Sequence, residues 1–192
     1  MVASNGRRAG KSRRDSSRRR RRSDGNRDSG ILEETMKIDS SFGHRALRRH
    51  RHSIEGTTYL LTAVTIDRRP IFNDWDTAVA AAATLADPGL WRDSKLLCWV
   101  LMPDHLHALV TLGDSEPLAK LMKRVKSVVA QVVNRQLNRN GSLWAPAFHD
   151  RALRHEDDLV DMARYIIANP VRAGLSPRVG MYPFWDAIWL PG

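Results

Sequence analysis

Residues 101–110 read Leu-Met-Pro-Asp-His-Leu-His-Ala-Leu-Val, and this stretch decides how the rest of the chain is interpreted. An apolar run reaches a proline turn and then continues with two histidines that a single leucine separates. Side chains alternate between the two faces of a β-strand, so His105 and His107 point to the same face. Two imidazoles on one strand face can bind a single metal ion. Two half-exposed histidines on a sheet surface are the alternative interpretation.

The segments on either side of this stretch predict an α+β domain. Apolar and β-branched runs predict strands at 57–66, 96–102 and 105–112, and a strand or extended loop at 143–153. Helical spacing of apolar residues predicts helices at 74–86, 117–138 and about 155–169, the last of which ends before Pro170. The aromatic segment 182–189 is expected to be a strap over the core.

This order predicts a ferredoxin-like sandwich, in which helices pack on an antiparallel sheet. The second and third strands are expected to form a hairpin. A sheet face that is bare, or covered by a late helix, can hold a metal ion and a nucleic-acid strand.

Charge divides the chain into two parts. The first 36 residues hold ten Arg and one Lys against three Asp and two Glu, which gives +6 of the net charge of +10. This segment has almost no apolar residues before Ile31, so 1–43 is predicted to be a disordered basic tail and 44–192 a single domain. The tail either holds phosphate backbones by charge or is dispensable, and Met36 is an alternative start.

Several classes of protein are excluded by the composition. No apolar stretch approaches the roughly 20 residues that span a bilayer, so no membrane association is expected. The basic tail lacks the apolar segment of a secretory signal. A lone Cys98 excludes an internal disulfide and is typical of a reducing, cytoplasmic setting.

Basic and aromatic side chains are candidates for binding nucleic acid. They lie in the basic cluster at 44–52, on the helix at 117–138, in the segment 144–154 and after the last helix. The candidates are Arg48, Arg49, Arg51, Lys123, Arg124, Trp144, Arg151, Arg154 and Arg172. A solvated surface is the alternative for the charged residues, and core packing is the alternative for Trp144.

A metal site at the two histidines needs a third ligand, preferably oxygen if the ion is Mg²⁺ or Mn²⁺. Asn169 offers a carbonyl oxygen, and Asp158 and Asp161 are rival ligands. Tyr165 precedes Asn169 by four residues, so the two lie on one face of a helix. A phenol beside a metal-bound phosphate can act as a nucleophile, although packing is the commoner role of a helical tyrosine.

Two long motifs, in this order, resemble a known family. Residues 101–107 resemble the metal-binding histidine-hydrophobic-histidine motif of the single-tyrosine HUH transposases. Residues 163–175, Ala-Arg-Tyr-Ile-Ile-Ala-Asn-Pro-Val-Arg-Ala-Gly-Leu, resemble the tyrosine helix of one branch, the REP-associated tyrosine transposases. Residues 148–154 and 182–185 are also similar to that branch. The resemblance covers about 44–190 and leaves the basic tail outside it.

The resemblance implies a ferredoxin-like enzyme that cuts and rejoins single-stranded or hairpin DNA, as a monomer or homodimer. His105 and His107 would bind the divalent metal, Mg or Mn, and Tyr165 would attack the scissile phosphate. The product would be a 5′-phosphotyrosine linkage with a free 3′-hydroxyl, and no nucleotide cofactor would be needed. In a related branch, a glutamine four residues after the tyrosine is the third metal ligand. Here that position is Asn169, whose side chain is one methylene shorter than that of glutamine.

Two other functions are compatible with the same residues. A catalytically silent protein would bind single-stranded or hairpin nucleic acid without cutting it. A metal nuclease would use water as its nucleophile, keep the histidines and leave Tyr165 as a packing residue.

Overall fold

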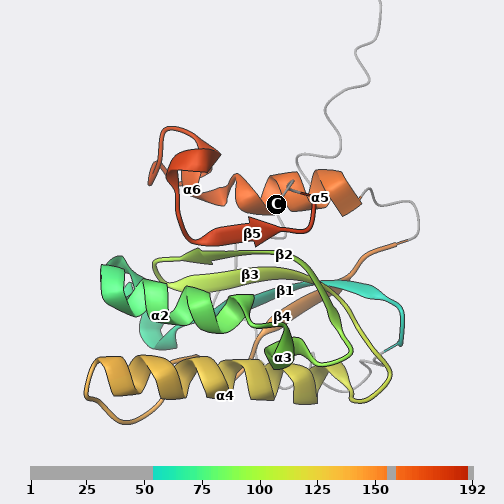
Figure 1. Ribbon diagram of the computed structural model, residues 1–192, viewed down its shortest axis with the longest axis horizontal. Coiled ribbons are helices and arrows are strands. Elements are labelled where there is room, and N and C mark those ends of the chain that lie inside the picture. Colours follow the sequence, from blue (N-terminus) through green and yellow to red (C-terminus); the bar gives the residue numbers. More distant parts are fainter. Residues whose placement is uncertain (1–53, 155–158, 190–192) are drawn as a thin grey trace, which may run out of the picture. The chain divides into compact units, whose positions relative to one another are not determined.

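The computed structural model describes residues 54–154 and 159–189. Its centre is an antiparallel sheet with the strand order β4-β1-β3-β2-β5 (Figure 1). The strands are β1 (Thr58–Val64), β2 (Lys95–Met102), β3 (His105–Thr111), β4 (His149–Ala152) and β5 (Trp185–Ala187). The helices are α2 (Trp75–Ala86), α3 (Pro88–Trp91), α4 (Leu118–Gln136), α5 (Leu159–Ile167) and α6 (Asn169–Arg172). Short 3₁₀ turns occupy Ile66–Arg68, Ile71–Asn73 and Val179–Met181.

The predicted sandwich of helices on an antiparallel sheet is confirmed. The predicted hairpin is also present: β2 and β3 pair directly across the Pro103-Asp104 turn, with Met102 opposite His105. Because directly paired residues share a face, this register places both histidines on one side of the sheet. The intervening Leu106 lies on the other side, where it is buried.

One face of the sheet forms the main hydrophobic core with α2 and α4. Asp74 caps α2, since its carboxylate accepts a hydrogen bond from the Thr77 backbone N–H at 2.9 Å. Six residues of α4 are buried at helical spacing, and each contributes about 1.5–3 kcal/mol by leaving water. They are Leu118, Leu121, Met122, Val125, Val129 and Val133. This layer of helices packs against the sheet that carries the two histidines.

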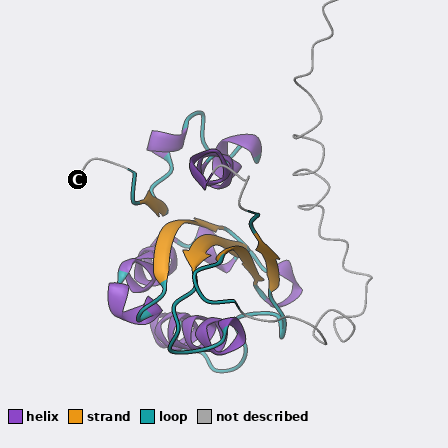
Figure 2. Cartoon of the chain, turned by 90° about the vertical axis from the view of Figure 1, so that its right-hand side faces the viewer, coloured by secondary structure: helices purple, strands orange, loops and turns teal. Residues whose placement is uncertain are grey.

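The opposite face is covered by the late helices. In Figure 1, α5 and α6 lie on one side of the sheet and α2 and α4 on the other, and Figure 2 shows helices on both sides of the curved sheet. The buried residues of α5 are Met162, Ala163 and Ile166, and α5 packs on β2, β3 and β5. Of the two arrangements considered for the second face, the covered one is present.

Two elements differ from the predictions. The helix expected to run to Asn169 ends at Ile167, and Asn169 opens a separate short helix, α6. Pro170 explains the break, because proline fits the first turn of a helix but not its interior. The segment expected to be a strap contains β5, which pairs with β2 from Cys98 to Val100. Without β5, β2 would be an edge strand with unpaired backbone N–H and C=O groups. Pairing with β5 satisfies these groups between Cys98 and Val100.

The short helix α3 was not predicted. Pro88 occupies its first turn, and the Asp87 carboxylate accepts a hydrogen bond from the Gly89 backbone N–H. None of the helices in the described ranges is both long enough and apolar enough to span a membrane. The predicted basic tail, 1–43, and the predicted start of the last helix at 155–158 lie outside the described residues.

Candidate functional site

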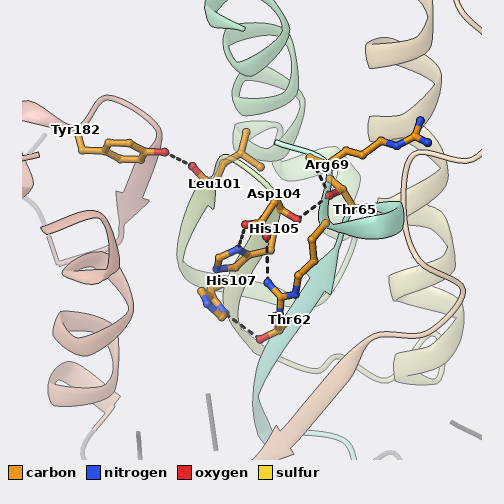
Figure 3. A network of polar contacts seen from close by, with 9 residues as sticks. Thr62, Thr65, Arg69, Leu101, Asp104, His105, His107 and Tyr182 are labelled. Carbon is orange, nitrogen blue, oxygen red and sulfur yellow. Dashed lines mark hydrogen bonds and ion pairs between the residues drawn. The ribbon is translucent and has the colours of Figure 1, made fainter. Parts of the chain in front are cut away.

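His105 and His107 lie side by side on β3, on the sheet face that α5 covers (Figure 3). Their ring centroids are 4.6 Å apart, and the rings meet edge to face at 81°. The predicted shared orientation of the two imidazoles is therefore present. Each ring also has one nitrogen bound to a neighbouring side chain, and the two neighbours differ.

The His107 ring is almost fully buried, with 2% of the residue exposed. Its Nδ1 is 2.8 Å from the hydroxyl oxygen of Thr62, the residue directly opposite on β1. Burial lowers the pKa of His107 well below its usual value. The ring is therefore neutral. Among the described residues, its buried Nε2 has no hydrogen-bond partner.

The His105 ring is held by the adjacent Asp104. The distance from Nδ1 to Asp104 Oδ1 is 2.5 Å, and Arg68 Nη1 donates to the other carboxylate oxygen at 3.0 Å. The hydrogen bond from His105 lowers the pKa of the Asp104 carboxyl. An ionised carboxylate only accepts hydrogen bonds, so Nδ1 of His105 carries the proton. In the neutral ring, Nε2 then presents its lone pair.

This arrangement fits a divalent metal ion. Metal-binding histidines usually hold a carboxylate, carbonyl or hydroxyl with the nitrogen that does not bind the metal. Asp104 and Thr62 occupy the Nδ1 atoms in this way and leave both Nε2 atoms to bind. Among the described residues, no group of three His, Cys, Asp or Glu side chains completes such a site. A third protein ligand from this part of the chain would therefore be of another class, such as an amide.

Tyr165 and Asn169 are brought together by Arg172. The Arg172 guanidinium lies over the Tyr165 ring, with Cζ 3.9 Å from its centroid. The same guanidinium donates to the Asn169 side-chain oxygen at 2.6 Å and to the Tyr165 backbone carbonyl at 2.8 Å. Asn169 is 9% exposed and donates from its amide nitrogen to the Ile166 carbonyl. Tyr165 and Asn169 therefore lie on one face, as predicted, although the helix breaks between them.

The three tyrosines lie in different surroundings. The chain has three tyrosines. Tyr59 is buried, and its hydroxyl oxygen accepts a hydrogen bond from the Ile54 backbone N–H. The Tyr182 hydroxyl donates to the Leu101 carbonyl at 2.7 Å, and burial raises its pKa to about 12 (Figure 3). Tyr165 is half-buried and has a cation against its ring.

The candidates for the third metal ligand differ in their surroundings. Asp161 is exposed on α5 and accepts a hydrogen bond from Arg164 at 2.8 Å. Asp158 lies outside the described residues. Asn169 is the candidate buried beside the tyrosine helix. Its role as a ligand stays a prediction, and its oxygen is bound to Arg172.

The structure separates the candidates for nucleic-acid binding into different groups. Lys123, Arg154 and Arg172 are exposed, and Arg151 lies half-buried on β4. Arg124 is paired with the buried carboxylate of Glu116. The remaining candidates, Arg48, Arg49 and Arg51, lie outside the described residues.

Trp144 belongs to the hydrophobic core. It is 6% exposed and packs against Phe72 with ring centroids 5.6 Å apart, and its indole N–H donates to the Lys126 carbonyl at 3.1 Å. A buried indole cannot stack on a nucleobase without leaving the core. Of the two interpretations of Trp144, the structure therefore supports packing.

Three site residues were missed in the sequence. Asp104 had a usable signal, because it directly precedes His105. Thr62 and Arg68 had none, since their contacts depend on how β1 and the turn after it lie against β3.

The chain is similar to known proteins. Residues 53–169 match the family described as "Transposase IS200 like". A REP-associated tyrosine transposase of Escherichia coli (strain K12) is 28% identical over 93 residues, which are 48% of this chain and 54% of that protein. The chain thus matches about half the length of this curated relative.

A solved structure has a similar fold. It is that of a REP-associated tyrosine transposase bound to a REP hairpin, and it superposes with a TM-score of 0.55 at 22% identity. The superposition covers 72% of this chain and 81% of that chain. The family match spans the histidine hairpin, Tyr165 and Asn169, and on that match the chain belongs to the IS200-like transposase family.

Proposed function

We propose that this protein is a metal-dependent transposase that cuts and rejoins single-stranded DNA through Tyr165. The observation that carries the proposal is the histidine pair. The buried Nε2 of His107 has no partner among the described residues, and His105 lies beside it on the sheet face covered by α5, the helix that contains Tyr165. A buried nitrogen without a partner is costly unless the fold keeps it for binding.

His105 and His107 would hold a divalent ion such as Mg²⁺ or Mn²⁺ through their Nε2 atoms, with Asn169 as the proposed third ligand. When bound, the ion would polarise the scissile phosphate and neutralise charge that develops there. Asp104 fixes the proton of His105 on Nδ1. The Thr62 hydroxyl favours the same tautomer of His107 when it accepts from Nδ1.

Tyr165 would supply the nucleophile. Its phenolic oxygen forms a bond to the phosphorus, and the bond from phosphorus to the 3′-oxygen breaks. The phenolic proton passes to solvent or a base, and the departing oxygen takes a proton to become a free 3′-hydroxyl. Because the 5′-phosphotyrosine bond retains the energy of the phosphodiester, attack by another 3′-hydroxyl rejoins DNA without a nucleotide cofactor.

Hairpin or single-stranded DNA is the proposed substrate. The chain carries a net charge of +10, and exposed Lys123, Arg154 and Arg172 add to its basic surface. Positive charge binds the phosphate backbone without reading sequence. The similar solved structure is bound to a REP hairpin, which supports the same type of ligand for this chain.

The test is a covalent adduct. The protein is incubated with single-stranded oligonucleotides that contain a hairpin, with Mn²⁺ or with EDTA, and is then denatured and run on a gel. We expect a denaturation-resistant adduct that needs the metal and is lost in Tyr165→Phe and in His107→Ala. DNA binding without cleavage would instead identify a catalytically silent binding protein. Cleavage that survives Tyr165→Phe and releases free DNA ends would identify a water-using nuclease.

A further inference from the structure

Arg172 contacts both residues that the proposed reaction needs on the late helices. Its Nη2 donates to the Asn169 side-chain oxygen at 2.6 Å and to the Tyr165 carbonyl at 2.8 Å. The central carbon of its guanidinium, Cζ, lies 3.9 Å from the centroid of the Tyr165 ring. Arg172 is nevertheless exposed. A guanidinium has five N–H donors, so its remaining donors can reach a ligand from solvent.

Arg172 lies on the helices that cover the histidine face of the sheet. Arg172 is the last residue of α6, which contacts β2, and Tyr165 is on α5, which contacts β2 and β3. The late helices therefore bring the guanidinium to the side of the sheet that carries His105 and His107. A divalent cation bound to the histidines would feel the same positive charge.

If Asn169 is the third ligand, its side-chain oxygen would lie between the metal ion and the Arg172 guanidinium. An amide oxygen has two lone pairs, and one of them accepts from Arg172. A divalent ion on the other lone pair would lie within a few ångströms of the guanidinium, where like charges in a partly buried site repel strongly. Asn169 cannot turn away freely, because its amide nitrogen donates to the Ile166 carbonyl and the residue is buried.

We propose that Arg172 couples DNA binding to metal binding by exchanging partners. A DNA phosphate draws the guanidinium from the Asn169 oxygen, and this oxygen then becomes available to the cation held by His105 and His107. The hydrogen bond to the Tyr165 carbonyl keeps the arginine, and with it the phosphate, beside the nucleophile. Arg172 is thus a positioning residue. The inference rests on the proposed metal and tyrosine chemistry.

The exchange is favourable for arginine. Its planar fork binds phosphate through charge-assisted hydrogen bonds, which are stronger than the bond to a neutral amide that they replace. Binding coupled in this way is reciprocal, so DNA tightens metal binding by the same factor as the metal tightens DNA binding.

The experiment measures Mn²⁺ affinity in a Tyr165→Phe background, which prevents covalent reaction and keeps an aromatic ring under Arg172. Free Mn²⁺ is followed by electron paramagnetic resonance, with and without a hairpin oligonucleotide. Without DNA, Arg172→Gln should bind Mn²⁺ about tenfold more tightly, because the competing charge is gone. The gain in Mn²⁺ affinity that DNA produces should shrink by a similar factor. Adding Asn169→Ala should remove the improvement made by Arg172→Gln.

Arg164→Gln is the matched control. Arg164 is exposed on α5 and pairs with Asp161, so its loss removes one charge from the same surface without touching Asn169. Its Mn²⁺ affinity should stay within about twofold of the parent, as exposed ion pairs contribute little. Arg172→Lys keeps a cation at the site and should bind DNA-free Mn²⁺ like the parent. If Arg172→Gln fails to fold, a tenfold gain in Mn²⁺ affinity in Arg172→Lys would contradict the proposal.

Equal or weaker Mn²⁺ binding by Arg172→Gln would overturn the proposal, as would an unchanged effect of DNA. An absence of Mn²⁺ binding in every variant would overturn it too. These outcomes are independent of the covalent adduct at Tyr165, which is measured on protein that retains the tyrosine. Failure of the coupling therefore differs from failure of the proposed reaction.

Discussion

Replacing Thr62 with valine removes the hydroxyl bound to His107 while keeping the shape of the side chain. Thr62 is 7% exposed, and its hydroxyl oxygen lies 2.8 Å from His107 Nδ1. In the variant, Nδ1 has lost this partner, and among the described residues Nε2 already has none. A buried polar group left unsatisfied costs about 1–3 kcal/mol. We expect the free energy of unfolding in EDTA to fall by this amount.

The same change should weaken metal binding. Without the hydroxyl, the tautomer of His107 that offers Nε2 loses the partner that favours it, and loss of such an outer partner typically weakens metal affinity about 10- to 100-fold. Urea unfolding measures the first effect, and calorimetric titration with Mn²⁺ measures the second. Thr62→Ser keeps the hydroxyl and should recover most of both.

Thr58→Val is the matched control for this prediction. Thr58 lies on the same strand and face as Thr62, and its hydroxyl is 2.9 Å from that of Thr111. It should lose stability without a change in Mn²⁺ affinity. Equal Mn²⁺ affinity in Thr62→Val and the wild type would refute the reasoning that Thr62 positions a metal ligand.

Three further predictions concern neighbouring groups. Asp104→Asn removes the carboxylate that holds His105, so the Mn²⁺ affinity measured by calorimetry should fall about tenfold. The control is Asp67→Asn, which removes an exposed ion pair with Arg69 and should leave the Mn²⁺ affinity unchanged. Burial lowers the pKa of His107 in the folded protein. Near pH 6.5 this side chain therefore takes up a proton in the unfolded chain but stays neutral in the folded protein. Stability in EDTA should therefore fall as the pH drops below about 6.5, by up to about 1.4 kcal/mol per pH unit for this group, and urea midpoints should show a smaller slope for His107→Asn. Trp144→Phe should cost about 1 kcal/mol of stability through the lost bond to Lys126, yet retain hairpin affinity in a filter-binding assay; a selective loss of DNA binding would restore the stacking role.

Local patterns predicted the scaffold well. The alternation around His105 and His107 predicted a shared face, which the β2–β3 register confirms. The apolar spacing of 117–138 predicted a helix whose buried stripe packs on the sheet, and α4 follows it closely. These signals are strong because each depends only on residues within one or two neighbouring elements.

Contacts between distant segments were not predictable in the same way. Thr62 meets His107 across 45 residues, and Arg68 meets Asp104 across 36, so both contacts follow from the strand register and not from any local pattern. Arg124 has the spacing of a solvated helix residue, but it is drawn to the buried Glu116 carboxylate, which needs a charged partner.

The central claim is that Tyr165, and no other tyrosine, becomes linked to DNA. The most direct measurement is mass spectrometry of protease digests of the adduct formed with a hairpin oligonucleotide and Mn²⁺. We predict a nucleotide-bearing peptide that contains Tyr165, with Tyr182→Phe still forming the adduct, because the Tyr182 hydroxyl is held by the Leu101 carbonyl. A modified peptide that contains Tyr59 or Tyr182, or an adduct that persists in Tyr165→Phe, would contradict the account.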